Sequence, residues 1–92
     1  MRLKDKVAVV TGAGGGIGQA TAVRFAQEGA ALVLVDLDEA GLNETAQLIA
    51  AAGGKAILAV GNVTKRSEVQ KMIDTAIQNF GRLDIAINNA GI

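Results

Sequence analysis

The 92-residue chain contains no cysteine, histidine or tyrosine, and each absence excludes a class of chemistry. Without cysteine it can form neither a disulfide nor a reactive thiolate. Without cysteine and histidine a zinc site would lack its usual ligands, so we predict no metal site. The chain also lacks the base of a Ser-His nucleophile system. Its single serine, Ser67, stands in a charged stretch.

Charge and hydropathy exclude two kinds of partner. Nine basic and nine acidic side chains are scattered along the chain and cancel, so no basic patch for nucleic acid is expected. The first apolar run, Val7 to Val10, has four residues. A secretory signal needs roughly 7–15 apolar residues, and a membrane span needs more. We therefore predict a cytoplasmic protein that binds neither nucleic acid nor membranes.

Short apolar runs alternate with helical patterns along the chain. Strands alternating with helices form a parallel sheet with right-handed crossovers, so we expect one α/β domain over residues 1–92 with the order βαβαβαβ. The strands are expected at Lys6 to Thr11, Ala31 to Asp36, Lys55 to Val60 and Leu83 to Asn88. The helices are expected from the glycine-rich turn to Glu28, from Asp38 to about Ala52, and from a Thr64 cap to Phe80. The third helix has the clearest apolar stripe, formed by Val69, Met72, Ile73, Ala76, Ile77 and Phe80.

A turn with five glycines, TGAGGGIG at residues 11–18, joins the first strand to the first helix. Gly12 lets the chain turn off the strand, the small residues that follow let a pyrophosphate approach the backbone, and Gly18 lets the helix lie close to the sheet. The helix N-terminus offers unpaired N–H groups and a partial positive charge. A turn without a ligand would need fewer glycines, because each costs roughly 0.5–1 kcal/mol relative to alanine in regular structure. This context predicts a phosphate-binding turn.

Two other nucleotide-binding families fit the turn less well. A P-loop requires Gly-Lys followed by Ser or Thr, whereas Gly18 is followed by Gln19 and Ala20. Methyltransferases that use S-adenosylmethionine usually place an acid just before the first glycine, and here Val10 and Thr11 stand in its place. A dinucleotide remains the favoured ligand.

Asp36 ends the second strand, 18 positions after Gly18. In a dinucleotide fold a carboxylate here accepts hydrogen bonds from the adenosine ribose. It would repel a 2′-phosphate, and Leu37 follows where an NADP site would want a basic residue. The sequence therefore favours NAD over NADP. The alternative role for Asp36 is to cap the next helix, but Asp38 is better placed for that role.

These features resemble the short-chain dehydrogenase/reductase family. Thr11, Gly12, Gly16 and Gly18 have the spacing of its first signature, and the stretch NNAG at residues 88–91 matches its second. The resemblance covers all 92 residues. It implies a Rossmann-type doubly wound parallel sheet with strand order 3-2-1-4, incomplete relative to the full family fold, with the fourth strand at an open edge.

The resemblance also implies the cofactor contacts. The glycine turn would hold the pyrophosphate and adjoining ribose, with the Thr11 hydroxyl tying this turn to the one after the fourth strand. The segments after strands two, three and four would hold the adenosine end. Asn62 stands where the family usually has Asp, and without charge its bond to adenine should be weaker. The predicted cofactor-binding residues are Gly12, Gly14, Gly15, Gly16, Ile17, Gly18, Asp36, Leu37, Asn62, Val63, Asn89, Ala90 and Gly91.

The family's catalytic Tyr, Lys and Ser have no counterpart in this sequence. The resemblance therefore implies the NAD-binding part of a longer oxidoreductase, which moves a hydride between nicotinamide and an alcohol or ketone. The 92 residues alone would be inactive. Two alternatives remain: a non-catalytic NAD-binding module, or a truncated fragment that self-associates through the open edge of the fourth strand.

Overall fold

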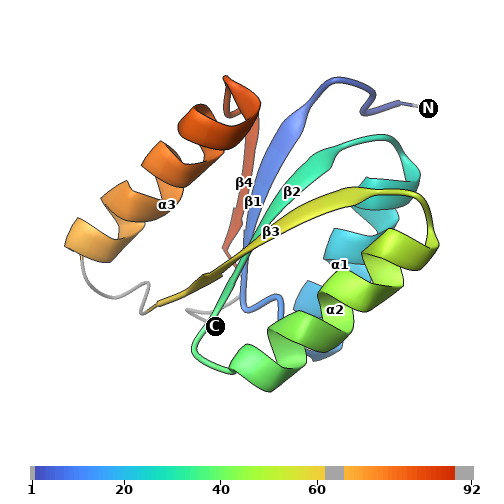
Figure 1. Ribbon diagram of the computed structural model, residues 1–92, viewed down its shortest axis with the longest axis horizontal. Coiled ribbons are helices and arrows are strands. Elements are labelled where there is room, and N and C mark those ends of the chain that lie inside the picture. Colours follow the sequence, from blue (N-terminus) through green and yellow to red (C-terminus); the bar gives the residue numbers. More distant parts are fainter. Residues whose placement is uncertain (1, 62–65, 89–92) are drawn as a thin grey trace.

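A computed structural model describes residues 2–61 and 66–88, and Figure 1 shows their arrangement. Every expected strand and helix is present. The first strand begins one residue later than expected and the fourth begins two residues later. The expected Thr64 cap lies outside the described residues. The elements are β1 (Val7–Thr11), α1 (Gly16–Gln27), β2 (Ala31–Asp36), α2 (Glu39–Ala51), β3 (Lys55–Val60), α3 (Arg66–Phe80) and β4 (Ile85–Asn88).

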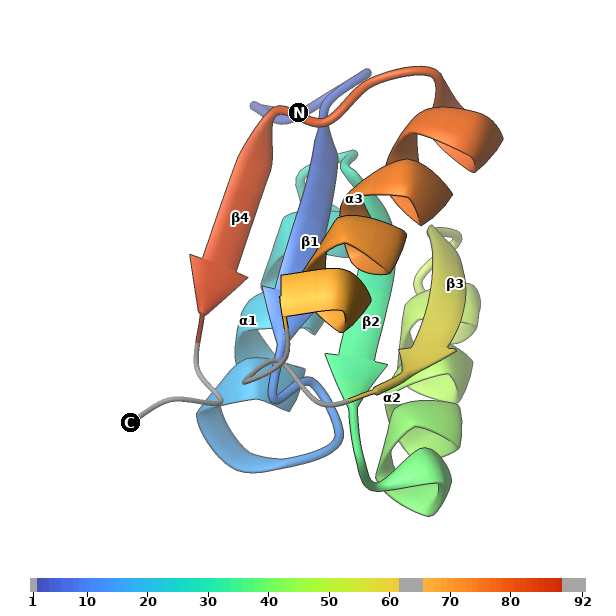
Figure 2. The ribbon, with the colours of Figure 1, turned by 90° about the vertical axis from the view of Figure 1, so that its left-hand side faces the viewer.

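The four strands form one parallel sheet in the order β3-β2-β1-β4, which confirms the predicted topology. Helices α1 and α2 cover one face of the sheet and α3 covers the other (Figure 1). All of β1 and the middle of β2 are buried, which explains why their sequences are continuously apolar rather than alternating. The carboxyl ends of all four strands lie at the same end of the sheet, and the glycine-rich turn lies there too (Figure 2).

Two apolar clusters hold the layers together. On the face covered by α1 and α2, the fully buried Leu34, Leu42 and Ile49 pack with small residues of α1. On the other face, Met72 and Ala76 of α3 pack against valines of β1 and β2. Within the part of the chain that the structure describes, no helix is both long and apolar enough to cross a membrane.

The apolar stripe predicted for α3 is only partly buried. Met72 and Ala76 are buried, but Val69 is 36% exposed and Ile77 is 50% exposed. The helix packs on β1 and β2, in the middle of the sheet. The flanks of a stripe this wide therefore lie beside the sheet contact, and the sequence pattern alone could not show which flank is covered.

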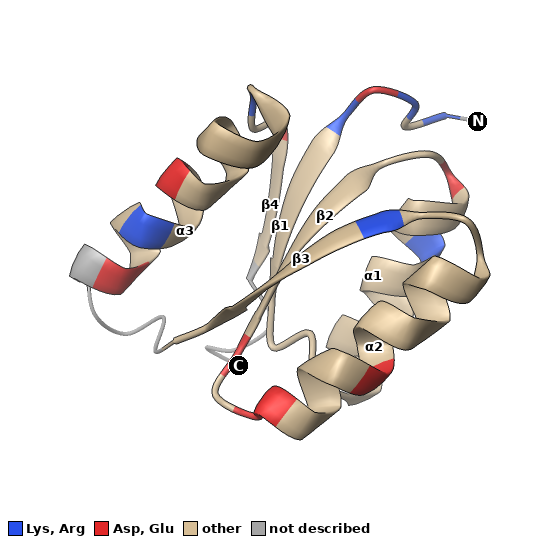
Figure 3. Cartoon of the chain, viewed as in Figure 1, with Lys and Arg blue, Asp and Glu red and all other residues tan. Residues whose placement is uncertain are grey.

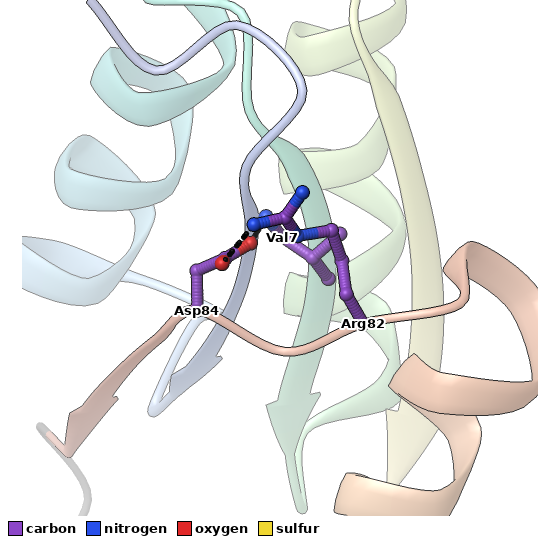
Figure 4. A network of polar contacts seen from close by, with 3 residues as sticks. All are labelled: Val7, Arg82 and Asp84. Carbon is purple, nitrogen blue, oxygen red and sulfur yellow. Dashed lines mark hydrogen bonds and ion pairs between the residues drawn. The ribbon is translucent and has the colours of Figure 1, made fainter.

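The start of β4 is fixed by a side chain rather than by a longer ladder (Figure 4). The Asp84 amide donates to the Val7 carbonyl, and the Val7 amide donates to Asp84 Oδ2. Each of these hydrogen bonds is 2.9 Å long. Arg82 Nη2 lies 2.7 Å from Asp84 Oδ1. The Arg82 hydrogen bond and then the Val7 amide hold the pKa of the Asp84 carboxyl below its ordinary value, and Asp84 raises the pKa of Arg82. The strand therefore begins at Ile85 rather than at the expected Leu83, and the Asp84 carboxylate just before it binds the start of β1.

Candidate cofactor site

Three glycines of the turn are required by its geometry, two by their backbone conformation and one by close packing. Gly12 and Gly16 have φ angles of 66° and 55°, in the left-handed region that favours glycine. A Cβ added to Gly18 would overlap the backbone of Gly12. The first turn of α1 therefore lies directly on the end of β1, as a pyrophosphate-binding turn requires.

The opposite side of this turn is open. A Cβ built on Gly15 or on Gly16 would meet no atom within 4 Å. Gly15 is the N-cap of α1 and has no side chain with which to cap the helix, and the first turn contains no acidic residue. The unpaired N–H groups and the positive end of the helix dipole are therefore accessible to an anionic ligand.

The Asp36 carboxylate lies beside the turn and is held by two backbone amides. Its Oδ2 accepts from the Gly14 amide over 2.9 Å, and its Oδ1 accepts from the Asp38 amide over 3.1 Å. A carboxylate has lone pairs for about four hydrogen bonds, so acceptor capacity remains for a ribose. Asp38 caps α2 by accepting a hydrogen bond of 3.1 Å from the Gly41 amide, which confirms its expected capping role.

The connection from β2 to α2 carries only negative charge. Residues 36–39 read Asp36, Leu37, Asp38 and Glu39, and Figure 3 shows the acidic residues at the end of β2 and the start of α2. A ligand bearing an additional phosphate at this point would meet three carboxylates. A neutral ribose would meet hydrogen-bond acceptors instead.

Three exposed apolar side chains stand at the same end of the sheet as these polar groups. Ile17 is 77% exposed at the start of α1, Leu37 is 67% exposed after β2, and Val60 is 54% exposed at the end of β3. Two of them were among the predicted site residues. Val60 was not among them; it ends β3 and stands opposite Asp36 in the β2–β3 register. Such surfaces suit the flat rings of a nucleotide.

Five predicted site residues lie outside the described part of the chain: Asn62, Val63, Asn89, Ala90 and Gly91. The described neighbours of these residues reach the same edge of the sheet. The Gly61 amide donates to the Asp36 carbonyl over 3.2 Å. The Thr11 hydroxyl donates to the Ile87 carbonyl over 3.3 Å, so it ties the end of β1 to the end of β4.

A cavity of about 620 Å³ lies at the opposite end of the sheet, among the amino ends of the strands and the C-termini of α1 and α2. Lys6, Lys55 and Phe80 are in its wall, and none of the predicted cofactor residues is. The candidate cofactor site is instead the surface around the glycine turn. Within the described ranges, no group of three or more acidic side chains is placed to hold a metal ion.

Comparison with known proteins agrees with this geometry. The family model described as short chain dehydrogenase matches residues 6–92. A 3-oxoacyl-(acyl-carrier-protein) reductase from Thermotoga maritima is 40% identical over 92 residues, which are all of this chain and 37% of that protein. A hydroxysteroid dehydrogenase from Escherichia coli superposes with a TM-score of 0.93 at 38% identity, over 99% of this chain and 39% of that one.

A structure bound to NAD is also similar. The short chain dehydrogenase from Mycobacterium paratuberculosis bound to NAD superposes with a TM-score of 0.93 at 34% identity, over all of this chain and 39% of that one. The chain thus spans little more than a third of the length of the relatives it matches. Because the match extends from the first strand through the last residue, this chain belongs to the short-chain dehydrogenase family.

Proposed function

We propose that this chain is the NAD-binding part of a short-chain oxidoreductase. The observation that carries the proposal is the position of the Asp36 carboxylate, fixed by the Gly14 amide beside the open N-terminus of α1. In this arrangement the carboxylate would accept from the ribose while the neighbouring turn would hold the diphosphate. The residues proposed to contact the cofactor are those of the glycine turn (Gly12, Gly14, Gly15, Gly16, Ile17 and Gly18), Asp36, Leu37, Asn62, Val63, Asn89, Ala90 and Gly91.

NAD is proposed over NADP because of the charge around Asp36. Asp38 and Glu39 follow it closely, and the connection contains no basic residue. At a separation of 4 Å two unit charges interact by about 1 kcal/mol in bulk water and by about 4 kcal/mol near a protein surface. A 2′-phosphate among these carboxylates would therefore weaken binding by a readily measured amount.

In the whole protein we propose hydride transfer between nicotinamide and an alcohol or ketone. The bound cofactor would supply the hydride or accept it. This chain's residues would bind and orient the cofactor, and the proton-transferring Tyr, Lys and Ser of the family would be contributed from outside residues 1–92. The shared length supports this division, since the matching relatives are well over twice as long. A cytoplasmic location remains a prediction.

A second behaviour, self-association, is favoured by the edge of the sheet. Strand β4 pairs with β1 and is at the end of the strand order. Ala86 on that strand is exposed, as is Ile77 on the α3 face. An unpaired strand edge beside apolar side chains is a template for pairing with a second chain. We propose that the 92-residue chain dimerises through β4 at high concentration.

A calorimetric titration of the purified chain with NAD, and separately with NADP, tests the proposed function. Circular dichroism first establishes that the sample is folded. Saturable NAD binding with weaker NADP binding is the expected result. A folded chain that binds no NAD at millimolar concentrations would refute the proposed NAD site. Equal affinities would refute only the preference for NAD.

A further inference from the structure

Thr45 of α2 is fully buried and reaches the backbone of the glycine turn. Its hydroxyl lies 2.6 Å from the Ala13 carbonyl oxygen and 3.1 Å from the Gly41 carbonyl oxygen. The longer contact is the bond that a helical threonine commonly makes to the preceding turn of its own helix. The shorter contact crosses to a segment 32 residues away. A threonine with a purely helical role would make only the longer one.

A second side chain completes the arrangement from α1. Gln19 Nε2 donates to Thr45 Oγ1 over 3.0 Å. A hydroxyl has one proton to donate and lone pairs to accept with. Donation to the Ala13 carbonyl leaves the oxygen free to accept from Gln19. One buried hydroxyl thus joins α1, α2 and the turn between β1 and α1.

The remaining groups of the turn show what this joint achieves. The Ala13 amide donates to the Val35 carbonyl over 3.1 Å, and the Gly14 amide donates to Asp36. A Cβ on Gly41 would overlap the Gly14 carbonyl, so α2 lies directly against the turn. The peptide groups of Ala13 and Gly14 are therefore fixed from β2 and α2. The following residues, Gly15 and Gly16, border open space.

We propose that Thr45 is a positioning residue for the cofactor's diphosphate. By holding the Ala13 carbonyl, its hydroxyl fixes the turn in the conformation that presents the amides at the start of α1 to the ligand. A turn that is already ordered loses less conformational entropy on binding, which raises affinity without a direct contact. This proposal rests on the proposed NAD binding and adds a residue that does not touch the cofactor.

The test compares three variants of the full chain. Thr45→Val keeps the shape and removes the hydroxyl, and Thr45→Ser restores it. Thr75→Val on α3 is the matched control, because the Thr75 hydroxyl makes the same bond to its own helix, to the Lys71 carbonyl over 2.8 Å. Each variant is titrated with NAD, with ADP and with adenosine, which lacks phosphate. Thermal unfolding is recorded alongside.

Of the hydrogen bonds that Thr45→Val removes, the one to the Ala13 carbonyl orders the turn, and loss of one hydrogen bond corresponds to about a 3- to 10-fold change in an equilibrium constant. Thr45→Val should weaken NAD and ADP by about this factor while adenosine, which would contact Asp36, binds as before. Thr45→Ser should recover most of the loss, and Thr75→Val should show none. An equal loss for adenosine would reveal a general structural role and overturn the proposal. Unchanged NAD affinity in folded Thr45→Val would overturn it while leaving NAD binding itself intact.

A milder variant covers the case in which Thr45→Val does not fold. Gln19→Met removes only the donor to Thr45 and keeps a good helix-forming residue of similar length. It should weaken NAD and ADP by about 2- to 3-fold, at the lower end of a single hydrogen bond. Unchanged affinity for both would contradict the proposed joint. If the wild-type chain binds no NAD, the proposed function fails first and this inference fails with it.

Discussion

The carboxylate of Asp36 and the backbone amide of Gly14 form a 2.9 Å hydrogen bond, so the end of β2 holds the glycine turn in place. The second carboxylate oxygen accepts from the Asp38 amide. A carboxylate that served only to bind the ribose would need neither of these two hydrogen bonds. Asp36 therefore has a structural role in the free protein in addition to its proposed role with the cofactor. Hydrogen bonds to an ionised acceptor are about twice as strong as neutral ones, so its charge contributes to both.

Asp36→Asn tests the charge separately from the shape. The single amide oxygen can replace only one carboxylate oxygen, so of the bonds from the Gly14 and Asp38 amides one becomes neutral and the other is lost. Each change costs about 1 kcal/mol or more. We expect NAD affinity to fall by about tenfold and NADP affinity to fall less, because one source of repulsion is removed. Calorimetry with both ligands measures the two changes. Glu44→Gln removes a charge from an exposed position further along α2 and serves as the control. Unaltered discrimination in Asp36→Asn would contradict the charge argument.

Alanine at two glycines of the same turn should affect different properties, stability at one and NAD affinity at the other. A Cβ on Gly18 would overlap the Gly12 backbone, so Gly18→Ala should lower the free energy of unfolding by about 1–3 kcal/mol or more. Gly15 has extended backbone and open space around it, so Gly15→Ala should change stability by less than about 0.5 kcal/mol. Its methyl would instead occupy the diphosphate's approach and weaken NAD by about tenfold. Urea unfolding and calorimetry on both variants separate the effects, and equal destabilisation would count against this division.

Sequence patterns predicted the elements and their order because these depend on local composition. Continuous β-branched runs, such as the one ending at Val35, are typical of a strand that is buried on both faces. Alternation of strands with helices predicts parallel strands joined by right-handed crossovers. Contacts between distant segments were not predictable in this way. Thr45 reads as an ordinary helical residue, and only the fold places it under Ala13. Likewise, the burial of Ile77 depends on which segments lie beside α3, and periodicity does not carry that information.

Low pH should weaken the contact between the starts of β1 and β4 and so lower the free energy of unfolding. The pKa of Asp84 is lowered in the folded chain, first by the Arg82 hydrogen bond and then by the Val7 amide. A group with a lowered folded pKa stabilises the protein above its unfolded pKa, here about 3.8, and the contribution disappears as pH falls through the folded pKa. We expect Asp84→Asn to reduce the free energy of unfolding at neutral pH and to flatten its decline below about pH 4.

The measurement is urea unfolding from pH 7 down to the most acidic pH at which the chain stays folded. Asp74→Asn is the control, because the Asp74 carboxylate accepts from the neutral amide of Gln70 on the same helix. The difference between wild type and Asp84→Asn should shrink toward acid pH, whereas the Asp74→Asn curve should follow that of wild type. A constant difference across the range would show that charge on Asp84 does not stabilise the strand junction.

The edge strand β4 gives the last prediction, which concerns self-association. Ala86 is exposed on β4, opposite Val9 of β1 in the sheet register. A lysine on an edge strand opposes strand pairing between chains, because its charge would have to be buried in the interface. Sedimentation velocity should show a concentration-dependent dimer of the wild-type chain, and Ala86→Lys should raise its dissociation constant by about tenfold or more. Ala20→Lys, which adds the same charge at an exposed position of α1, should leave association unchanged. If both lysine variants weaken the dimer equally, net charge rather than the β4 edge controls association, whereas a wild-type chain that stays monomeric at millimolar concentration would refute edge pairing altogether.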